Sequence, residues 1–302
     1  MARAGREEYS KRHMKRFFFL SGLPRSGSTL LTSILSQNSG LYASPNSPLV
    51  ELLVNVRQHL RTTEQARAFL EPRQEGDVLR AIMGGFYQFS DAENILDKSR
   101  AWPHPHNIEL LKGILPEEPK FVAVVRSLPE VLASFISLIE AHPESKSFVD
   151  RELEKRGLPF TAENRCEVLF SPEGTVHEAW YTLKMAFDGG YGKLFHIIEY
   201  DDLCAHPRET VEGVYRFLGL PPFAHSFSSI INKTPEDDAV YNLPGLHDVR
   251  PTIEKISKDP ALVLGPELAA KYAAVPHFWR KKAAAPQPAQ PVQPANPFII
   301  RT

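Results

Sequence analysis

The chain contains one segment with the residue types and spacing of a phosphate-binding loop. In the run that begins at Gly22 and reads GLPRSGST, the second glycine, Gly27, follows five positions later. Backbone N–H groups of such a loop, continued by a helix N-terminus, cradle phosphate oxygens. Nucleotide hydrolases carry lysine directly after the second glycine, whereas this chain has Ser28 there and Arg25 inside the loop. The segment therefore predicts an anion site and disfavours an ATP or GTP hydrolase.

Apolar runs along the chain predict the elements that position this loop. Residues 17–20 have the length of a short buried strand, and apolar positions at helical spacing over 29–36 predict a helix. Further strands are expected at Asn94–Lys98, Phe121–Val125 and 194–198, with helical patterns between them. This alternation predicts an α/β fold, a P-loop-like parallel sheet flanked by helices, with helical insertions over 47–89 and 141–174.

A second candidate anion site follows the strand expected at Phe121–Val125. Arg126 ends that strand, and Ser134 lies eight positions further on, inside the next expected helix. A guanidinium suits bidentate contact with phosphate. Because open α/β sheets bind their ligands at the carboxyl ends of parallel strands, both anion sites are expected at one edge. A nucleotide with two separate phosphate groups would satisfy both.

Together these residues resemble the nucleotide-binding motifs of the sulfotransferase family. Residues 24–29 are similar to its 5′-phosphosulfate loop, and Arg126 with Ser134 matches its 3′-phosphate motif in type and spacing. Arg25 stands where many cytosolic members have lysine and where protein-tyrosine sulfotransferases carry arginine. The resemblance covers about residues 17–220 and implies 3′-phosphoadenosine-5′-phosphosulfate (PAPS) as co-substrate, without a metal. It implies nucleotide-binding roles for Arg25, Ser26, Gly27, Ser28, Thr29, Arg126, Ser134 and Tyr200.

The resemblance also implies catalytic and further binding roles. Lys98 looks like the lysine of the family's second-strand region, which points toward the sulfuryl group or its leaving oxygen. Arg25 would hold the phosphosulfate during transfer, and Arg250 lies roughly where cytosolic members carry a late basic segment for the 3′-phosphate. Sulfuryl transfer is an in-line displacement, so fixed cations should stabilise the charge that grows on the leaving oxygen.

The group that accepts the acceptor's proton stays open in the sequence. Cytosolic members have histidine two positions after the lysine, where this chain has Arg100, and the acidic residue of the protein-tyrosine type has no evident counterpart. Glu51 and His104, with His106 beside the latter, are the candidate bases. On residue type alone, the simpler interpretation of Glu51 is a helix-face carboxylate, and that of His104 is a surface-loop histidine.

Composition argues against several other classes of protein. The 302 residues carry 35 basic and 36 acidic side chains, a formal net charge of −1, so no nucleic-acid partner is expected. The two cysteines, Cys166 and Cys204, cannot form a disulfide framework, which favours the cytoplasm. The apolar run after residue 16 is interrupted by Pro24 and Arg25, so neither a signal peptide nor a membrane span is expected.

The sequence thus predicts one sulfotransferase-like domain over residues 1–282 and a disordered tail, rich in Pro, Ala and Gln, over 283–302. The expected partner is a small-molecule or peptide acceptor whose pocket is shaped by residues 47–89 and 141–174. The protein is expected to be a monomer or homodimer. A P-loop kinase using ATP and a non-catalytic nucleotide-binding protein of the same fold remain as alternatives.

Overall fold

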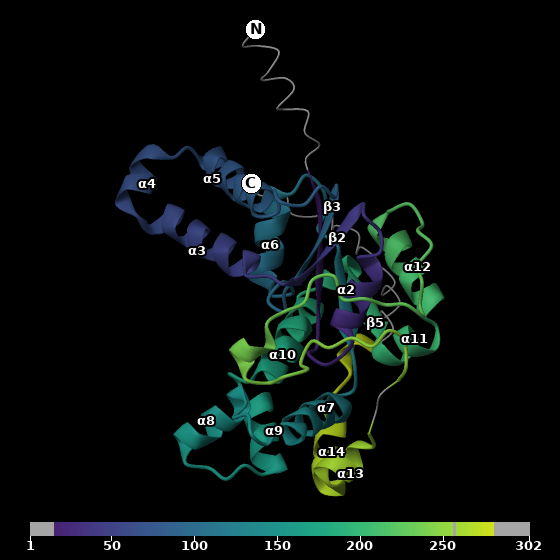
Figure 1. Ribbon diagram of the computed structural model, residues 1–302. Coiled ribbons are helices and arrows are strands. Elements are labelled where there is room, and N and C mark those ends of the chain that lie inside the picture. The colour runs from purple at the N-terminus through teal and green to yellow at the C-terminus, as the bar shows by residue number, and fades with distance from the viewer. Residues whose placement is uncertain (1–14, 256–257, 281–302) are drawn as a thin grey trace, which may run out of the picture.

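A five-stranded parallel sheet forms the centre of the protein (Figure 1). The computed structural model describes residues 15–255 and 258–280. The strands lie in the order β2-β3-β1-β4-β5, so β1 is flanked by β3 and β4 and the strand order reverses there. Open α/β sheets bind their ligands at such a reversal. The predicted α/β fold is confirmed, and the strands are β1 (Arg16–Gly22), β2 (Leu41–Asn46), β3 (Asn94–Lys98), β4 (Phe121–Val125) and β5 (Phe195–Glu199).

Strand β2 is not predicted by the sequence. Its residues, LYASPN, include no β-branched side chain and contain Pro45. Proline has no N–H to donate and is tolerated in a sheet at an edge strand. Strand β2 is such an edge, paired with β3 through a register that shifts between Ala43 and Asn46. Its pairing with β3, rather than its local propensity, makes this segment a strand.

Alternate side chains of the strands pack into two apolar layers, one on each face of the sheet. Phe19 and Phe121 belong to the larger layer, whereas Leu20 and Val122 belong to the smaller one. The larger layer is built with α3 (Leu49–Thr62), α5 (Pro72–Phe86), α6 (Pro105–Ile114), α7 (Leu128–Ala141), α8 (Phe148–Arg156), α9 (Ala162–Phe170), α10 (Thr175–Asp188), α13 (Pro260–Leu264) and α14 (Pro266–Ala273). The smaller layer is built with α2 (Ser28–Leu35), α11 (Tyr200–Ala205) and α12 (Pro207–Leu218).

The segments expected to form insertions are helical. Residues 47–89 contain α3, α4 (Glu64–Phe69) and α5, which extend away from the sheet, and residues 141–174 contain α8 and α9 (Figure 1). The 3₁₀ helices are η1 (Tyr191–Leu194), η2 (Asp238–Tyr241) and η3 (Phe278–Arg280). No helix within the described ranges is long and apolar enough to cross a membrane. The tail expected over 283–302 lies outside the described residues, so its separation from residues 1–282 stays a prediction.

The end of β1 is constrained by its close approach to β4. Gly22 has a φ of 116°, and a Cβ at this position would lie 2.0 Å from the carbonyl oxygen of Val124. That same oxygen accepts a hydrogen bond of 2.9 Å from the Leu23 N–H. Only glycine fits both the dihedral angle and the space. Gly22 therefore fixes the point at which the phosphate loop leaves the sheet.

We expect Gly22→Ala to lower the free energy of unfolding by more than about 2 kcal/mol, because backbone strain adds to the overlap with Val124. The matched control is Gly157→Ala after α8, where φ is 66° and the added Cβ meets no atom within 4 Å. In that control the free energy of unfolding should fall only by the cost of the backbone strain, about 1 kcal/mol. Urea unfolding followed by circular dichroism compares the two variants. An equal decrease in the free energy of unfolding of both variants would show that the close contact with Val124 adds nothing to the cost of the substitution.

Candidate functional site

A cavity of about 830 Å³ lies at the carboxyl edge of the sheet. Lys98 is the last residue of β3, Arg126 directly follows β4, and Tyr200 directly follows β5, and all three line this cavity. Residues of the phosphate loop line it as well. The volume lies within the range of small-molecule and cofactor sites, about 300 to 1,000 Å³. The structure thus brings both sequence-predicted anion motifs into one cavity.

The phosphate loop presents its backbone to this cavity. Arg25 has a left-handed φ of 58°, and Gly27, with φ of 90°, is the N-cap of α2. Among the described residues, no acceptor receives the N–H groups of residues 26–29. A Cβ on Gly27 would lie 2.7 Å from Cδ2 of Tyr200, so the second glycine of the motif is required by packing as well as by φ. N–H groups arranged in this way at a helix N-terminus are of the kind that binds anions.

The side chain of Arg25 connects the phosphate loop to two other segments. Its Nε donates to Oγ of Ser134 on α7 at 3.2 Å, and its Nη1 donates to the carbonyl of Leu246. Burial and the nearby charge of Arg126 lower the pKa of Arg25, and Asp238 opposes this shift. The residue predicted for the 5′ side and the serine predicted for the 3′ side are therefore in direct contact.

Arg126 makes a second contact between the phosphate loop and the segment that follows β4. Its Nη1 donates to the carbonyl oxygen of Arg25 at 3.3 Å, and its guanidinium lies 4.4 Å from the ring centroid of Tyr200. An ion pair of 3.5 Å connects it to Glu130. The arginine is 7% exposed, so its orientation is set by the surrounding protein. A fixed guanidinium of this kind suits a phosphate group.

Lys98 is held at the end of β3 by the backbone and by its neighbour. Its N–H donates to Oγ of Ser44 on β2 at 2.9 Å. The preceding carboxylate, Asp97, is fully buried and accepts hydrogen bonds from the Tyr87 hydroxyl and, at 2.6 Å, from Nε1 of Trp102. Burial raises the pKa of Asp97, and these donors oppose the shift. Asp97 thereby fixes the strand end from which Lys98 reaches the cavity.

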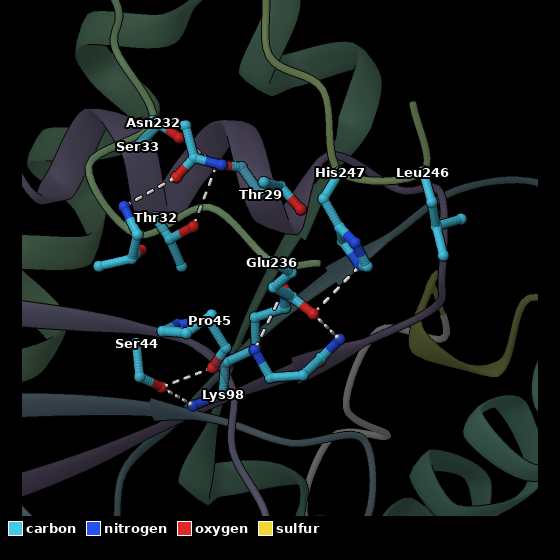
Figure 2. Close-up of polar contacts among 12 residues, drawn as sticks. Thr29, Thr32, Ser33, Ser44, Pro45, Lys98, Asn232, Glu236, Leu246 and His247 are labelled. Carbon is cyan, nitrogen blue, oxygen red and sulfur yellow. Dashed lines mark hydrogen bonds and ion pairs between the residues drawn. The ribbon is translucent and has the colours of Figure 1, made fainter. Parts of the chain in front are cut away.

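The ammonium group of Lys98 pairs with a carboxylate that lies far away in the sequence. Its Nζ is 3.1 Å from Oε1 of Glu236, whose Oε2 accepts from Nδ2 of Asn46 at 2.9 Å and lies 3.3 Å from Nε2 of His247 (Figure 2). Burial raises the pKa of Glu236, but Lys98, His247 and Asn46 bring it below its ordinary value. Burial lowers the pKa of Lys98; Glu236 opposes this and Arg100 adds to it.

His247 is oriented by a second carboxylate. Its Nδ1 lies 2.6 Å from Oδ1 of Asp238, and its backbone N–H donates to Oδ2 of the same residue at 3.1 Å. Burial lowers the pKa of His247, and the hydrogen bond to Asp238 together with the charge of Glu236 opposes that shift. His247 lines the cavity beside Lys98, which makes it a histidine within reach of a ligand held there.

The other sequence-predicted residues lie at the rim of the cavity or away from it. Arg250 lines the cavity but is exposed, and its Nη1 lies 3.4 Å from Glu254. Glu51 is exposed on α3 and does not line the cavity. His104 is the N-cap of α6, where its Nδ1 accepts from the His106 N–H at 3.2 Å, and it does not line the cavity either. Neither candidate base therefore lies in the cavity lining with Lys98.

Three residues at this site, Glu236, Asp238 and His247, were not singled out from the sequence. Glu236 lies 138 residues after Lys98, and the segment between 219 and 260 has little regular structure to predict their meeting. The sequence feature nearest to them is the run Leu246–Arg250, which predicts a binding role for Arg250 but none for His247. Across residues 15–255 and 258–280, no group of three or more His, Cys, Asp or Glu residues could hold a metal ion.

Comparison with known proteins places these features in a family. The sequence matches the profile of the Sulfotransferase family over residues 18–225. A search of curated proteins finds no match. Among solved structures, the chain is similar to the sulfotransferase domain from the curacin biosynthetic pathway, at 18% identity and a TM-score of 0.46, covering 93% of this chain and 95% of that one.

Two further solved structures are similar to this chain. One is the sulfotransferase domain from the Synechococcus PCC 7002 olefin synthase, at 19% identity and a TM-score of 0.41, covering 88% of this chain and 90% of that one. The other is a sulfotransferase from Alicyclobacillus acidocaldarius, at 17% identity and a TM-score of 0.44, covering 75% of this chain and 87% of that one. Because the profile match spans more than half of the sequence and includes the phosphate loop, Lys98 and Arg126, the chain belongs to the sulfotransferase family.

Proposed function

We propose that the protein transfers a sulfuryl group from PAPS to a hydroxyl or amine of a small-molecule or peptide acceptor. The observation that carries this proposal is the junction of the two anion motifs in one cavity. Arg25 contacts Ser134 at 3.2 Å, and Arg126 donates to the Arg25 carbonyl at 3.3 Å. Two joined anion sites suit a nucleotide that has phosphate groups at two positions.

The donor's two ends are assigned to different segments. The N–H groups of residues 26–29, the Ser28 and Thr29 hydroxyls and the Arg25 guanidinium bind the 5′-phosphosulfate. Arg126 and Ser134 bind the 3′-phosphate, with Arg250 at the rim, and Tyr200 walls the nucleotide site. The contact between Tyr200 and Arg126 supports this assignment, because the ring holds the guanidinium in place at the cavity wall.

The transfer itself needs cations at the leaving group and a base at the acceptor. The acceptor oxygen attacks sulfur and forms the new O–S bond while the bond from sulfur to the bridging phosphate oxygen breaks. The electron pair of that broken bond stays on the phosphate oxygen, where Lys98 and Arg25 stabilise the growing negative charge. The acceptor proton leaves to a base, and the products are a sulfate ester and adenosine 3′,5′-bisphosphate.

We assign the base to His247, because Glu51 and His104 do not line the cavity. Asp238 holds Nδ1 of the ring at 2.6 Å, which leaves Nε2 to take the proton. Glu236 lies 3.3 Å from Nε2, so the imidazolium formed by proton transfer is flanked by two carboxylates. Such an arrangement stabilises the charged ring at the moment when the acceptor loses its proton.

The first test is calorimetric titration with adenosine 3′,5′-bisphosphate, run beside ATP with magnesium. We expect the bisphosphate to bind and Arg126→Ala to weaken binding by about 1.5 to 3 kcal/mol, because a charge-assisted contact is lost. Arg216→Ala, which removes a 72%-exposed arginine of α12, is the control and should bind as the unmodified protein does. Preference for magnesium-ATP would support a kinase instead, and unchanged affinity in Arg126→Ala would remove Arg126 from the nucleotide site.

Lys98→Gln should mainly affect the chemical step. We expect single-turnover transfer from labelled PAPS to fall by about 10²-fold or more, because the leaving oxygen loses its cation, while bisphosphate affinity changes little. Lys155→Gln on the exposed face of α8 serves as the control. A parallel loss of affinity and rate would mean that Lys98 acts in ground-state binding only.

The pH profile tests His247. A base must be unprotonated, and burial lowers the pKa of His247 below its ordinary value of about 6.5. The transfer rate should therefore be full at neutral pH and fall as the pH drops through that lowered value. In His247→Gln we expect a rate about 10²- to 10⁴-fold lower, without this acid limb. Persistence of the limb in the variant would assign it to another group near the ring, such as the carboxyl group of Glu236.

A further inference from the structure

Arg100 differs from Lys98 and Arg126, two other cations of the cavity, in its contacts with the described residues. Lys98 pairs with Glu236 at 3.1 Å, and Arg126 pairs with Glu130 at 3.5 Å. Within the part of the chain that the structure describes, no residue forms a hydrogen bond or ion pair with the Arg100 guanidinium, although Arg100 lines the same cavity. The protein therefore leaves this positive charge available to a ligand.

The surroundings of Arg100 do not neutralise it. Burial lowers its pKa, and Glu236, Tyr241 and Glu178 oppose that shift only in part. Glu236 is already shared between Lys98, Asn46 and His247, and Glu178 is exposed on α10. Placing a guanidinium in a partly buried position without an acceptor is costly. Such a cost is offset when a ligand supplies the missing negative charge.

Arg100 lies near residues of η2 and α10, and it also lies near the phosphate loop, because its charge lowers the pKa of Arg25. Tyr241 belongs to η2 and Glu178 to α10, and neither element contains a residue of the two anion motifs. The anions of the donor already have Arg25, Arg126 and the loop N–H groups to bind them. A further cation in the cavity lining, with which no described residue pairs, therefore points to an anion of the second substrate.

We propose that Arg100 binds an oxyanion group of the acceptor, such as a carboxylate, and thereby selects hydroxyl compounds that carry negative charge. This inference rests on the proposed function and specifies its acceptor class. A guanidinium binds a carboxylate through two parallel hydrogen bonds, which fixes orientation as well as charge. Because Arg100 and Lys98 line the same cavity, we expect a compact acceptor that carries the anion and the reacting hydroxyl in one small molecule. That description fits short hydroxy acids and hydroxyaryl acids.

The test uses the full-length protein saturated with adenosine 3′,5′-bisphosphate, so that ligands bind without reacting. Calorimetry measures 3-hydroxybutyrate and 4-hydroxybenzoate, each beside its uncharged amide, at constant ionic strength. We expect an acid to bind about tenfold or more tightly than its amide, and Arg100→Gln to abolish this preference. Arg100→Lys, which keeps the charge but not the planar fork, should retain part of it, and Arg216→Gln on α12 should retain all of it.

Each outcome bears on one assignment. If the bisphosphate binds but neither acid binds better than its amide, Arg100 is not an acceptor anion site and the proposed function stands. If Arg100→Gln instead loses bisphosphate affinity by about tenfold while keeping its thermal midpoint, Arg100 belongs to the nucleotide site and the inference is overturned. If the unmodified protein fails to bind the bisphosphate, the proposed function itself is refuted.

Discussion

The carboxylate of Glu236 joins three segments of the site that lie far apart in the sequence. It accepts from Lys98 at the end of β3, from Asn46 at the end of β2, and lies against His247 in the following segment. A buried ammonium without such a partner would be strongly destabilised, and so would the carboxylate alone. One ion pair therefore fixes the direction of Lys98 and at the same time ties the segment after residue 220 to the sheet. The rest of the cavity depends on that segment being in place, since it also supplies the Leu246 carbonyl to Arg25.

The distribution of charge explains how an almost neutral chain can bind a highly anionic nucleotide. The formal net charge is −1, yet the strand ends gather Arg25, Lys98, Arg100 and Arg126 around a single cavity. Charges in a partly buried site are screened much less than those on the surface. The carboxylates that face this cluster, Glu130 and Glu236, neutralise two of the four cations. Anions are therefore attracted to the cavity because its cations outnumber the carboxylates that pair with them, although the total charge of the chain is close to zero.

The sequence was sufficient for those features that short runs of residues determine. The apolar run at Phe121–Val125 and the glycine spacing of the phosphate loop each specify local structure, and the structure has a strand and a strand-to-helix loop there. Strand β2 escaped prediction because its pairing with β3, not its composition, makes it a strand. The meeting of Lys98 with Glu236 has no local signature at all.

The two candidate bases, Glu51 and His104, show that residue type alone does not predict which side chains reach the cavity. Glu51 has the right chemistry, but Leu49, Val50 and Leu53 pack α3 against the core and leave Glu51 facing solvent. His104 is used to cap α6. Residue type identified groups able to take a proton, whereas the helix faces and the long segment after α12 decided which of them reaches the cavity. Asp238 and His247, nine residues apart, meet only through the turn at η2.

The form of β2 has a consequence for contacts between copies of the protein. An edge strand normally exposes a row of N–H and C=O groups that can pair with another chain. Here Pro45 removes one donor and the register shift between Ala43 and Asn46 breaks the regular repeat. A second molecule therefore finds no continuous ladder to extend on this side of the sheet. Self-association by sheet growth is disfavoured at β2 by the same irregular segment that delivers Asn46 to Glu236.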